Sequence, residues 1–192
     1  MGQRGNSIVR ISQRRLKGRL AVLTATLVLS TAAAWAGPEA AWNPTGSMAI
    51  GRFSFTATTL QNGNVLVAGG ITPGDVVTNK AELYNPATGL FTATGNMNRP
   101  RVGFSATRLP NGKVLVEGGA SDTDFGTATA ELYDPATGIW SLTGSMNQGR
   151  QQHSAVLLRD GKVLVTGGNI ERTPGSDVCA TTIGILALTV TS

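Results

Sequence analysis

The chain has a single cysteine, Cys179, and a single histidine, His153, in 192 residues. One cysteine excludes a disulfide bridge within the chain and leaves only a bridge to another chain. One histidine, without a Cys or carboxylate cluster at ligand spacing, argues against a zinc or copper site built from these ligands. We therefore expect no metal site and no cofactor.

Acidic residues are missing from the first 36 positions, which hold six of the 16 Lys and Arg residues. Beyond them, ten basic residues face 11 acidic ones, so the net charge of +5 comes from the leader. Nucleic-acid binding is not expected, because it needs positive charge clustered on the folded domain. Helical periodicity is scarce, and 25 glycines with 8 prolines predict an all-β fold rich in turns.

The leader has the three parts of a secretory signal peptide. A basic region ends at Arg19, an apolar run covers residues 20–36, and the run ends in the small-x-small sequence AWA. We predict cleavage between Ala36 and Gly37, and export to the periplasm, the cell surface or the medium. The alternative is a retained membrane anchor, since the run approaches the length that spans a bilayer. In that case we expect membrane contact through this segment alone.

A nonapeptide recurs three times at a fixed interval. Residues 111–119, NGKVLVEGG, have near-copies NGNVLVAGG and DGKVLVTGG located 49 residues before and after. This interval divides the chain into repeat 1 (residues 43–91), repeat 2 (92–140) and repeat 3 (141–189). A period near 50 residues indicates propeller blades or another repeat array. The expected domains are therefore a signal peptide, residues 1–36, and a repeat domain, residues 37–192.

Each repeat is predicted to be a meander of four antiparallel strands. Two strand-like runs meet at Asn-Gly or Asp-Gly, which favours a two-residue type I′ turn. The third strand is AELY, and the fourth begins near Phe91 or Trp140. Trp42 has the same phase, so we expect a fourth strand to begin there as well. No helical pattern follows the glycine pairs, so we interpret them as points of close backbone approach rather than phosphate loops.

The order of residues within the repeat resembles the kelch repeat. It runs Arg-x-x-Phe/His, apolar strand, Gly-Gly, Tyr-Asn/Asp-Pro, aromatic and Thr-Gly-Ser/Asn-Met, and it covers residues 42–168. The regular form found here is similar to exported bacterial kelch-repeat proteins. The resemblance implies a β-propeller, usually of six or seven blades. The first strand of each blade would then line a central channel, and loops at one face would bind ligands.

The repeat pattern is lost after Gly168. Residues 179–182 stand where AELY is expected, and Ile183-Gly184 replaces Asn/Asp-Pro. The tail from Thr181 is still strand-like, so we expect it either to patch the sheet or to come from a shifted or truncated reading frame. Two full blades and partial ones do not close a ring, because propellers need about four to eight. We therefore expect a fragment, a degenerate paralogue, or an array completed by self-association through open edges.

Three arginines, Arg52, Arg101 and Arg150, recur at one position just before the first strand of each repeat. They are candidate ligand-binding residues, because converging guanidinium groups hold carboxylates or sugar acids by paired hydrogen bonds. In the alternative interpretation each arginine pairs with a carboxylate such as Glu82 or Glu131, or with carbonyl groups, and ties the scaffold together.

His153 is a further candidate ligand-binding residue. It stands where the other repeats have Phe55 and Phe104, so a packing or hydrogen-bonding role is the alternative. The pair Asp122-x-Asp124 is a fragment of a calcium-loop pattern, but the other oxygen ligands are missing and a solvated connection is expected.

No catalytic residue is predicted, since no nucleophile elbow is present and His153 has no evident triad partners. We predict an exported, non-catalytic module that binds a protein or a glycan. Its binding surface would be formed by residues 71–80, 120–129 and 169–178, the segments that differ most between repeats. One alternative is a fragment of a carbohydrate-active propeller enzyme whose catalytic residues lie in missing blades. Another is the remnant of a decayed gene.

Overall fold

The computed structural model describes residues 42–170 and 184–186. The chain divides into two compact parts, Met1–Trp42 and Asn43–Ser192, and the fold below is that of the second part by itself. The predicted signal peptide, with its cleavage site between Ala36 and Gly37, lies outside the described residues, as does Cys179. All regular structure in the described ranges is β-strand, which confirms the all-β prediction. No helix long and apolar enough to cross a membrane occurs in these ranges.

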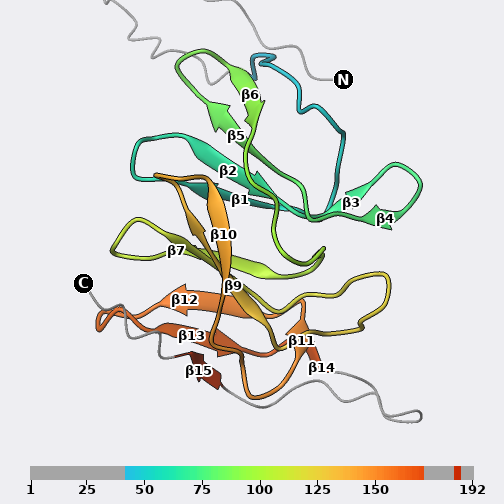
Figure 1. Cartoon of the computed structure of the whole chain (residues 1–192), viewed down its shortest axis with the longest axis vertical. Helices are drawn as coiled ribbons and strands as arrows, with labels where there is room; N and C mark the ends of the chain where they lie inside the picture. Colours follow the sequence, from blue (N-terminus) through green and yellow to red (C-terminus); the bar gives the residue numbers. More distant parts are fainter. Residues whose placement is uncertain (1–41, 171–183, 187–192) are drawn as a thin grey trace, which may run out of the picture. The chain divides into compact units, whose positions relative to one another are not determined.

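Repeats 1 and 2 each form one four-stranded antiparallel meander, as predicted (Figure 1). In both sheets the strands lie in the order in which the chain produces them. Repeat 1 also has a short hairpin in the connection between its second and third strands. The strands of repeat 1 are β1 (Thr56–Thr59), β2 (Val65–Ala68), β3 (Ile71–Thr72), β4 (Val76–Val77), β5 (Ala81–Asn85) and β6 (Leu90–Ala93). Those of repeat 2 are β7 (Ser105–Arg108), β8 (Val114–Glu117), β9 (Ala130–Asp134) and β10 (Ile139–Thr143).

The hairpin turns are at the predicted places but are not of the predicted type. In repeat 1 the Gly63 N–H donates to the Leu60 carbonyl and the Leu60 N–H donates to the Asn64 carbonyl, so the loop has three residues. Gly63 has a φ of +85°, and Asn62 is not among the described residues with positive φ, so this is no type I′ turn. A left-handed glycine closing a three-residue loop is the glycine-bulge hairpin. The Asn62 side chain accepts the Asn64 N–H at 3.1 Å, which explains the preference for Asn or Asp at this position.

Repeat 3 follows the pattern as far as its second strand. Its elements are β11 (Arg150–Gln151), β12 (Ser154–Leu157), β13 (Val163–Thr166), β14 (Asn169–Ile170) and β15 (Gly184–Leu186). Strand β15 pairs with β13 as the third strand β5 pairs with β2 in repeat 1. This confirms that part of the tail adds a strand to the sheet. The register differs from that of repeat 1, in which Val67 pairs with Glu82. Val165, the equivalent of Val67, pairs with Gly184 and not with residue 180, the equivalent of Glu82.

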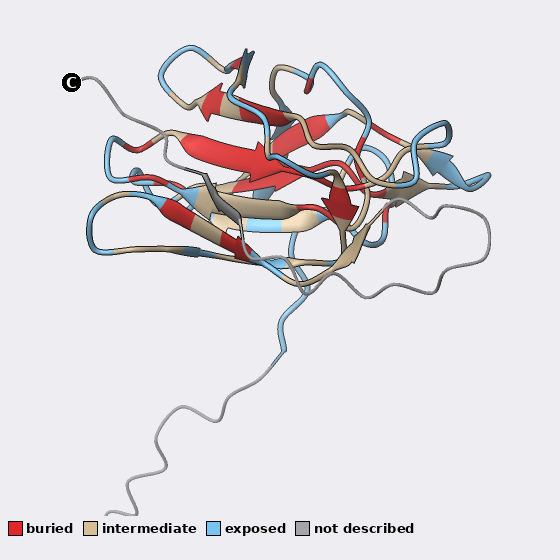
Figure 2. Cartoon of the chain, turned by 90° about the horizontal axis from the view of Figure 1, so that it is seen from below, coloured by how far each residue is buried: buried red, intermediate tan, exposed pale blue. Residues whose placement is uncertain are grey.

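The repeats pack against each other through successive first strands, β1 on β7 and β7 on β12, which follow one another from top to bottom in Figure 1. The apolar second strand of repeat 2 faces both neighbours. Val114 and Val116 pack in a cluster with residues of repeat 1, and Leu115 packs in a second cluster with residues of repeat 3. Figure 2 shows the buried segments concentrated in the strands and the exposed ones mostly in the connections. The unbroken Val-Leu-Val run is therefore explained by burial on both faces, as predicted.

The glycine pairs let neighbouring repeats approach closely. Gly69 has a φ of +65°, and a Cβ added to it would lie 2.6 Å from the carbonyl oxygen of Arg101 in the next repeat. In the first two pairs the second glycine donates across the same contact: Gly70 N–H to the Arg101 carbonyl at 2.9 Å, and Gly119 N–H to the Arg150 carbonyl at 2.8 Å. The interpretation of these glycines as points of close backbone approach is confirmed.

The strand expected from Trp42 is absent. Residues 42–48 have no regular structure, and Trp42 is fully exposed. A fourth strand pairs with the third strand of its own sheet, as β6 does with β5, and no described strand precedes residue 42 to serve as that partner. The described strands do not close into a ring.

Candidate functional site

The three arginines of the repeat lie in the interior rather than around an open face. Arg101 is fully buried, and its Nη2 contacts Glu131 Oε1 at 3.0 Å. Its Nη1 donates to the carbonyl groups of Gly118 and Thr129 at 2.6 and 3.0 Å. Glu131 also accepts the backbone N–H of Asn98 at 2.6 Å. Burial lowers the pKa of Arg101, while the charge of Glu131 and its hydrogen bond act in the opposite direction.

The same arrangement is found in repeat 1 and in part in repeat 3. Arg52 contacts Glu82 at 2.6 Å and donates to the carbonyl groups of Gly69 and Lys80. Arg150 donates to the carbonyl of Gly167 at 2.7 Å. The scaffold interpretation, with Glu82 and Glu131 as partners, is thus the arrangement observed. A ligand would have to displace these buried bonds to reach Arg52 or Arg101, and desolvated ion pairs are costly to break.

His153 lies in the contact between repeats 2 and 3 and faces a buried carboxylate. Its Nε2 is 3.9 Å from Glu117 Oε1, and both side chains are fully buried. No hydrogen bond to either side chain is formed within the described residues. Burial raises the pKa of the Glu117 carboxyl, while His153 and the charge of Arg101 lower it. The two side chains face each other without a hydrogen bond, and their burial keeps them from acting on a solvent-borne substrate.

The position of this pair in the repeat explains how it arose. His153 packs against Gly118 as Phe104 packs against Gly69: a Cβ on either glycine would lie 2.6–2.7 Å from the ring facing it. Glu117 occupies the position that Ala68 has in repeat 1. An apolar Ala–Phe contact at the first interface is therefore replaced by a Glu–His contact at the second.

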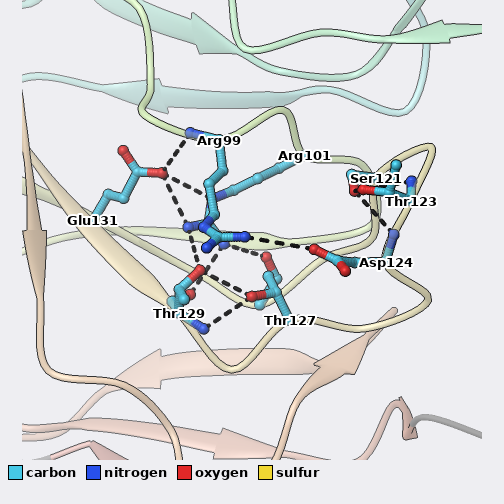
Figure 3. A network of polar contacts seen from close by, with 9 residues as sticks. Arg99, Arg101, Ser121, Thr123, Asp124, Thr127, Thr129 and Glu131 are labelled. Atoms are coloured by element: carbon cyan, nitrogen blue, oxygen red, sulfur yellow. Dashed lines mark hydrogen bonds and ion pairs between the residues drawn. The ribbon is translucent and has the colours of Figure 1, made fainter.

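A small solvent-open pocket lies at the end of repeat 2 that carries the glycine pair. It has a volume of about 80 Å³ and is lined by Arg99, Pro100, Ala120, Ser121, Thr123, Asp124 and Thr127. Arg99 Nη1 is 3.5 Å from Asp124 Oδ2, and both side chains are 50% exposed. Figure 3 shows this pair beside the buried Arg101–Glu131 group. The pocket therefore offers donors, an acceptor and hydroxyl groups to the solvent.

Local hydrogen bonds order the connection that forms this pocket. The Ser121 hydroxyl accepts the N–H groups of Thr123 and Asp124, at 3.3 and 3.1 Å. Asp122 accepts the N–H of Val77 at 3.3 Å and so joins the corresponding connection of repeat 1. Asp122 and Asp124 are thus engaged with protein groups, and residues 42–170 contain no group of three or more side chains suited to a metal ion.

The pocket and the buried pair were not identified as units from the sequence, although a signal for both exists. Arg99 stands where the other repeats have Ile50 and Gln148, and Glu117 stands where they have Ala68 and Thr166. A charged residue at a position that differs in all three repeats is such a signal, because the scaffold alone does not require it.

Comparison with known proteins gives no assignment: no protein-family model matches this chain, and no curated protein matches it.

Proposed function

We propose that the protein is an exported, non-catalytic module that binds glycans through the pocket of repeat 2. The observation that carries this proposal is the half-exposed Arg99–Asp124 pair on an ordered connection. A guanidinium group donates and a carboxylate accepts, while a sugar hydroxyl does both. One hydroxyl group, or two adjacent ones, can therefore bridge the pair, and the hydroxyls of Ser121 and Thr127 offer further partners.

Three properties of the pocket support a glycan over other ligands. The exposed ion pair contributes only about 0–1 kcal/mol to stability, so a ligand can take over its bonds at little cost. Phe125, on the same connection, is 41% exposed and offers an apolar face of the kind that packs on a sugar ring. The volume of about 80 Å³ is well below the roughly 300–1,000 Å³ that encloses a whole small molecule, so the pocket would receive one group of a larger chain.

The resemblance to exported kelch-repeat proteins agrees with this proposal, because the pocket lies on one of the connections that vary between repeats. The enzyme alternative, with catalytic residues in further blades, stays a prediction. No observation in the described residues favours it over binding.

Binding of defined oligosaccharides tests the proposal. We expect the full chain to bind a neutral oligosaccharide on a glycan array, and calorimetric titration to give a Kd in the micromolar to millimolar range. Arg99→Gln and Asp124→Ala should each weaken binding by about 10-fold or more, because each removes a charged hydrogen-bonding partner. Arg159→Gln, at an exposed arginine in the hairpin of repeat 3, is the matched control and should bind normally. Binding to no glycan, or equal binding by Arg99→Gln, contradicts the proposal.

A further inference from the structure

The two ends of the described array are complementary halves of one contact. Within the chain this contact is made twice, between repeats 1 and 2 and between repeats 2 and 3. Each time an aromatic ring from the later repeat packs on the first glycine of a pair in the earlier one. The N-terminal end carries an unused ring, and the C-terminal end carries an unused glycine pair.

The N-terminal end exposes a surface that repeat 2 buries. Phe104 is 7% exposed in its contact with repeat 1, whereas the equivalent Phe55 is 37% exposed. Met97 is fully buried, and the equivalent Met48 is only half-buried. Phe53, on the same end, is 54% exposed. We call this surface the ring face.

The C-terminal end exposes the surface that receives such a ring. No described atom lies within 4 Å of a Cβ placed on Gly167, in contrast to the equivalents Gly69 and Gly118. Leu164 is half-buried, whereas its equivalents Leu66 and Leu115 are completely buried in the contacts between repeats. Val156, beside Leu164 on the neighbouring strand, is 52% exposed. We call this surface the glycine face.

Main-chain groups at the two ends match in the same way. At each internal contact the second glycine of the pair donates its N–H to the carbonyl of the next arginine. The corresponding groups at the ends, the Gly168 N–H and the Arg52 carbonyl, have no such partner among the described residues. Each end thus presents one of the two apolar surfaces of such a contact. Each end also presents one of the two groups, the N–H or the carbonyl, of its main-chain hydrogen bond.

We propose that the ring face of one copy of this chain docks on the glycine face of a second copy. The contact is heterologous, so it closes a ring or grows a filament, depending on the rotation that it repeats. Two copies supply six hairpins of first and second strands, within the range of about four to eight blades from which propellers close. The geometry therefore points to a head-to-tail dimer that closes on itself. This proposal does not depend on glycan binding.

Single substitutions at each face test the dimer. We expect the full chain to sediment as a dimer at micromolar concentration. Phe55→Asp should weaken association by about 30-fold or more, as for a central aromatic of an interface. Val156→Asp should do the same from the glycine face. Phe125→Ser removes an aromatic of similar exposure, 41% against 37% for Phe55, that lies on neither face, and this control should remain a dimer.

Mixing the variants tests the direction of the contact. Phe55→Asp keeps the glycine face, and Val156→Asp keeps the ring face, so each alone should be a monomer and a mixture should form a pair through one contact. A chain that is monomeric at all concentrations overturns the proposal. So does a dimer that persists in either variant, because that result indicates a symmetric contact. Larger assemblies that Phe55→Asp abolishes would overturn the two-copy ring.

Discussion

The contact between repeats 1 and 2 and the contact between repeats 2 and 3 use the same positions of the repeat with different chemistry. The first joins Phe104 to Gly69 and Ala68 and contains ten buried residues, among them the aromatic rings of Tyr133 and Trp140. The second places His153 against Gly118 and Glu117, and its buried cluster has five aliphatic residues. In both, a glycine makes room for the ring and a main-chain hydrogen bond crosses the contact.

This difference shows which parts of the repeat are fixed and which vary together. The glycine pair and the arginine carbonyl are fixed, because backbone approach depends on them. The residue before the pair and the ring that faces it change jointly, from Ala and Phe to Glu and His. In a repeat array each unit contacts only its neighbours, so such a joint change alters one contact and leaves the next unaffected.

The largest expected effect comes from breaking the polar contact on one side. His153→Phe leaves the Glu117 carboxyl group buried against an apolar ring without its polar neighbour, and a buried polar group left unsatisfied costs about 1–3 kcal/mol. We expect the free energy of unfolding in urea to fall by this amount near neutral pH, at one fixed protein concentration. Ser154→Ala, at an exposed neighbour on β12, should change it by less than about 0.5 kcal/mol. An unchanged midpoint for His153→Phe would show that Glu117 does not need the imidazole.

A smaller effect of opposite sign is expected when the second contact is given the chemistry of the first. The double variant Glu117→Ala, His153→Phe installs the pair found at Ala68 and Phe104. Replacement of both members of a buried polar pair by apolar groups is often nearly neutral or stabilising. We expect the double variant to be at least as stable as the protein itself, although His153→Phe alone is not. A double variant as unstable as the single one would mean that the two side chains are not coupled.

The smallest effect is a pH dependence that only the second contact should have. Burial raises the pKa of the Glu117 carboxyl above its ordinary value of 4.5. The stability that this carboxyl contributes is therefore complete below pH 4.5 and is lost as the pH rises through the raised pKa. Glu117→Gln stays neutral, so its free energy of unfolding should fall less than that of the protein as the pH rises above 4.5. Parallel curves for the two proteins would contradict this assignment.

Much of the fold could be predicted from the sequence because the signals are local and occur three times. The hairpins at Asn62, Asn111 and Asp160 follow from turn chemistry. The turn type was wrong, because the choice between a two-residue and a three-residue loop depends on which residues pair at the strand ends. The prediction of a strand from Trp42 was also wrong, because a strand needs a hydrogen-bonding partner, and the phase of the repeat does not supply one.

The candidate site could be predicted less well. Arg52, Arg101 and Arg150 were correctly placed at one repeated position, but the sequence left open whether they face a ligand or the scaffold. That choice depends on burial, and only the packed repeats show the three guanidinium groups bonded to carbonyl groups, with Glu82 facing Arg52 and Glu131 facing Arg101. The pocket at Arg99 joins residues from two segments that come together only on folding.

The sequence by itself therefore determined the repeat, its strands and its turns, because period, β-propensity and left-handed glycines act within a few residues. Tertiary structure alone decided that Glu117 meets His153, that Arg99 meets Asp124, and that Gly184–Leu186 pairs with β13 out of phase with the repeat. These contacts join residues far apart in the chain, and their energies depend on desolvation and on the neighbours that packing supplies.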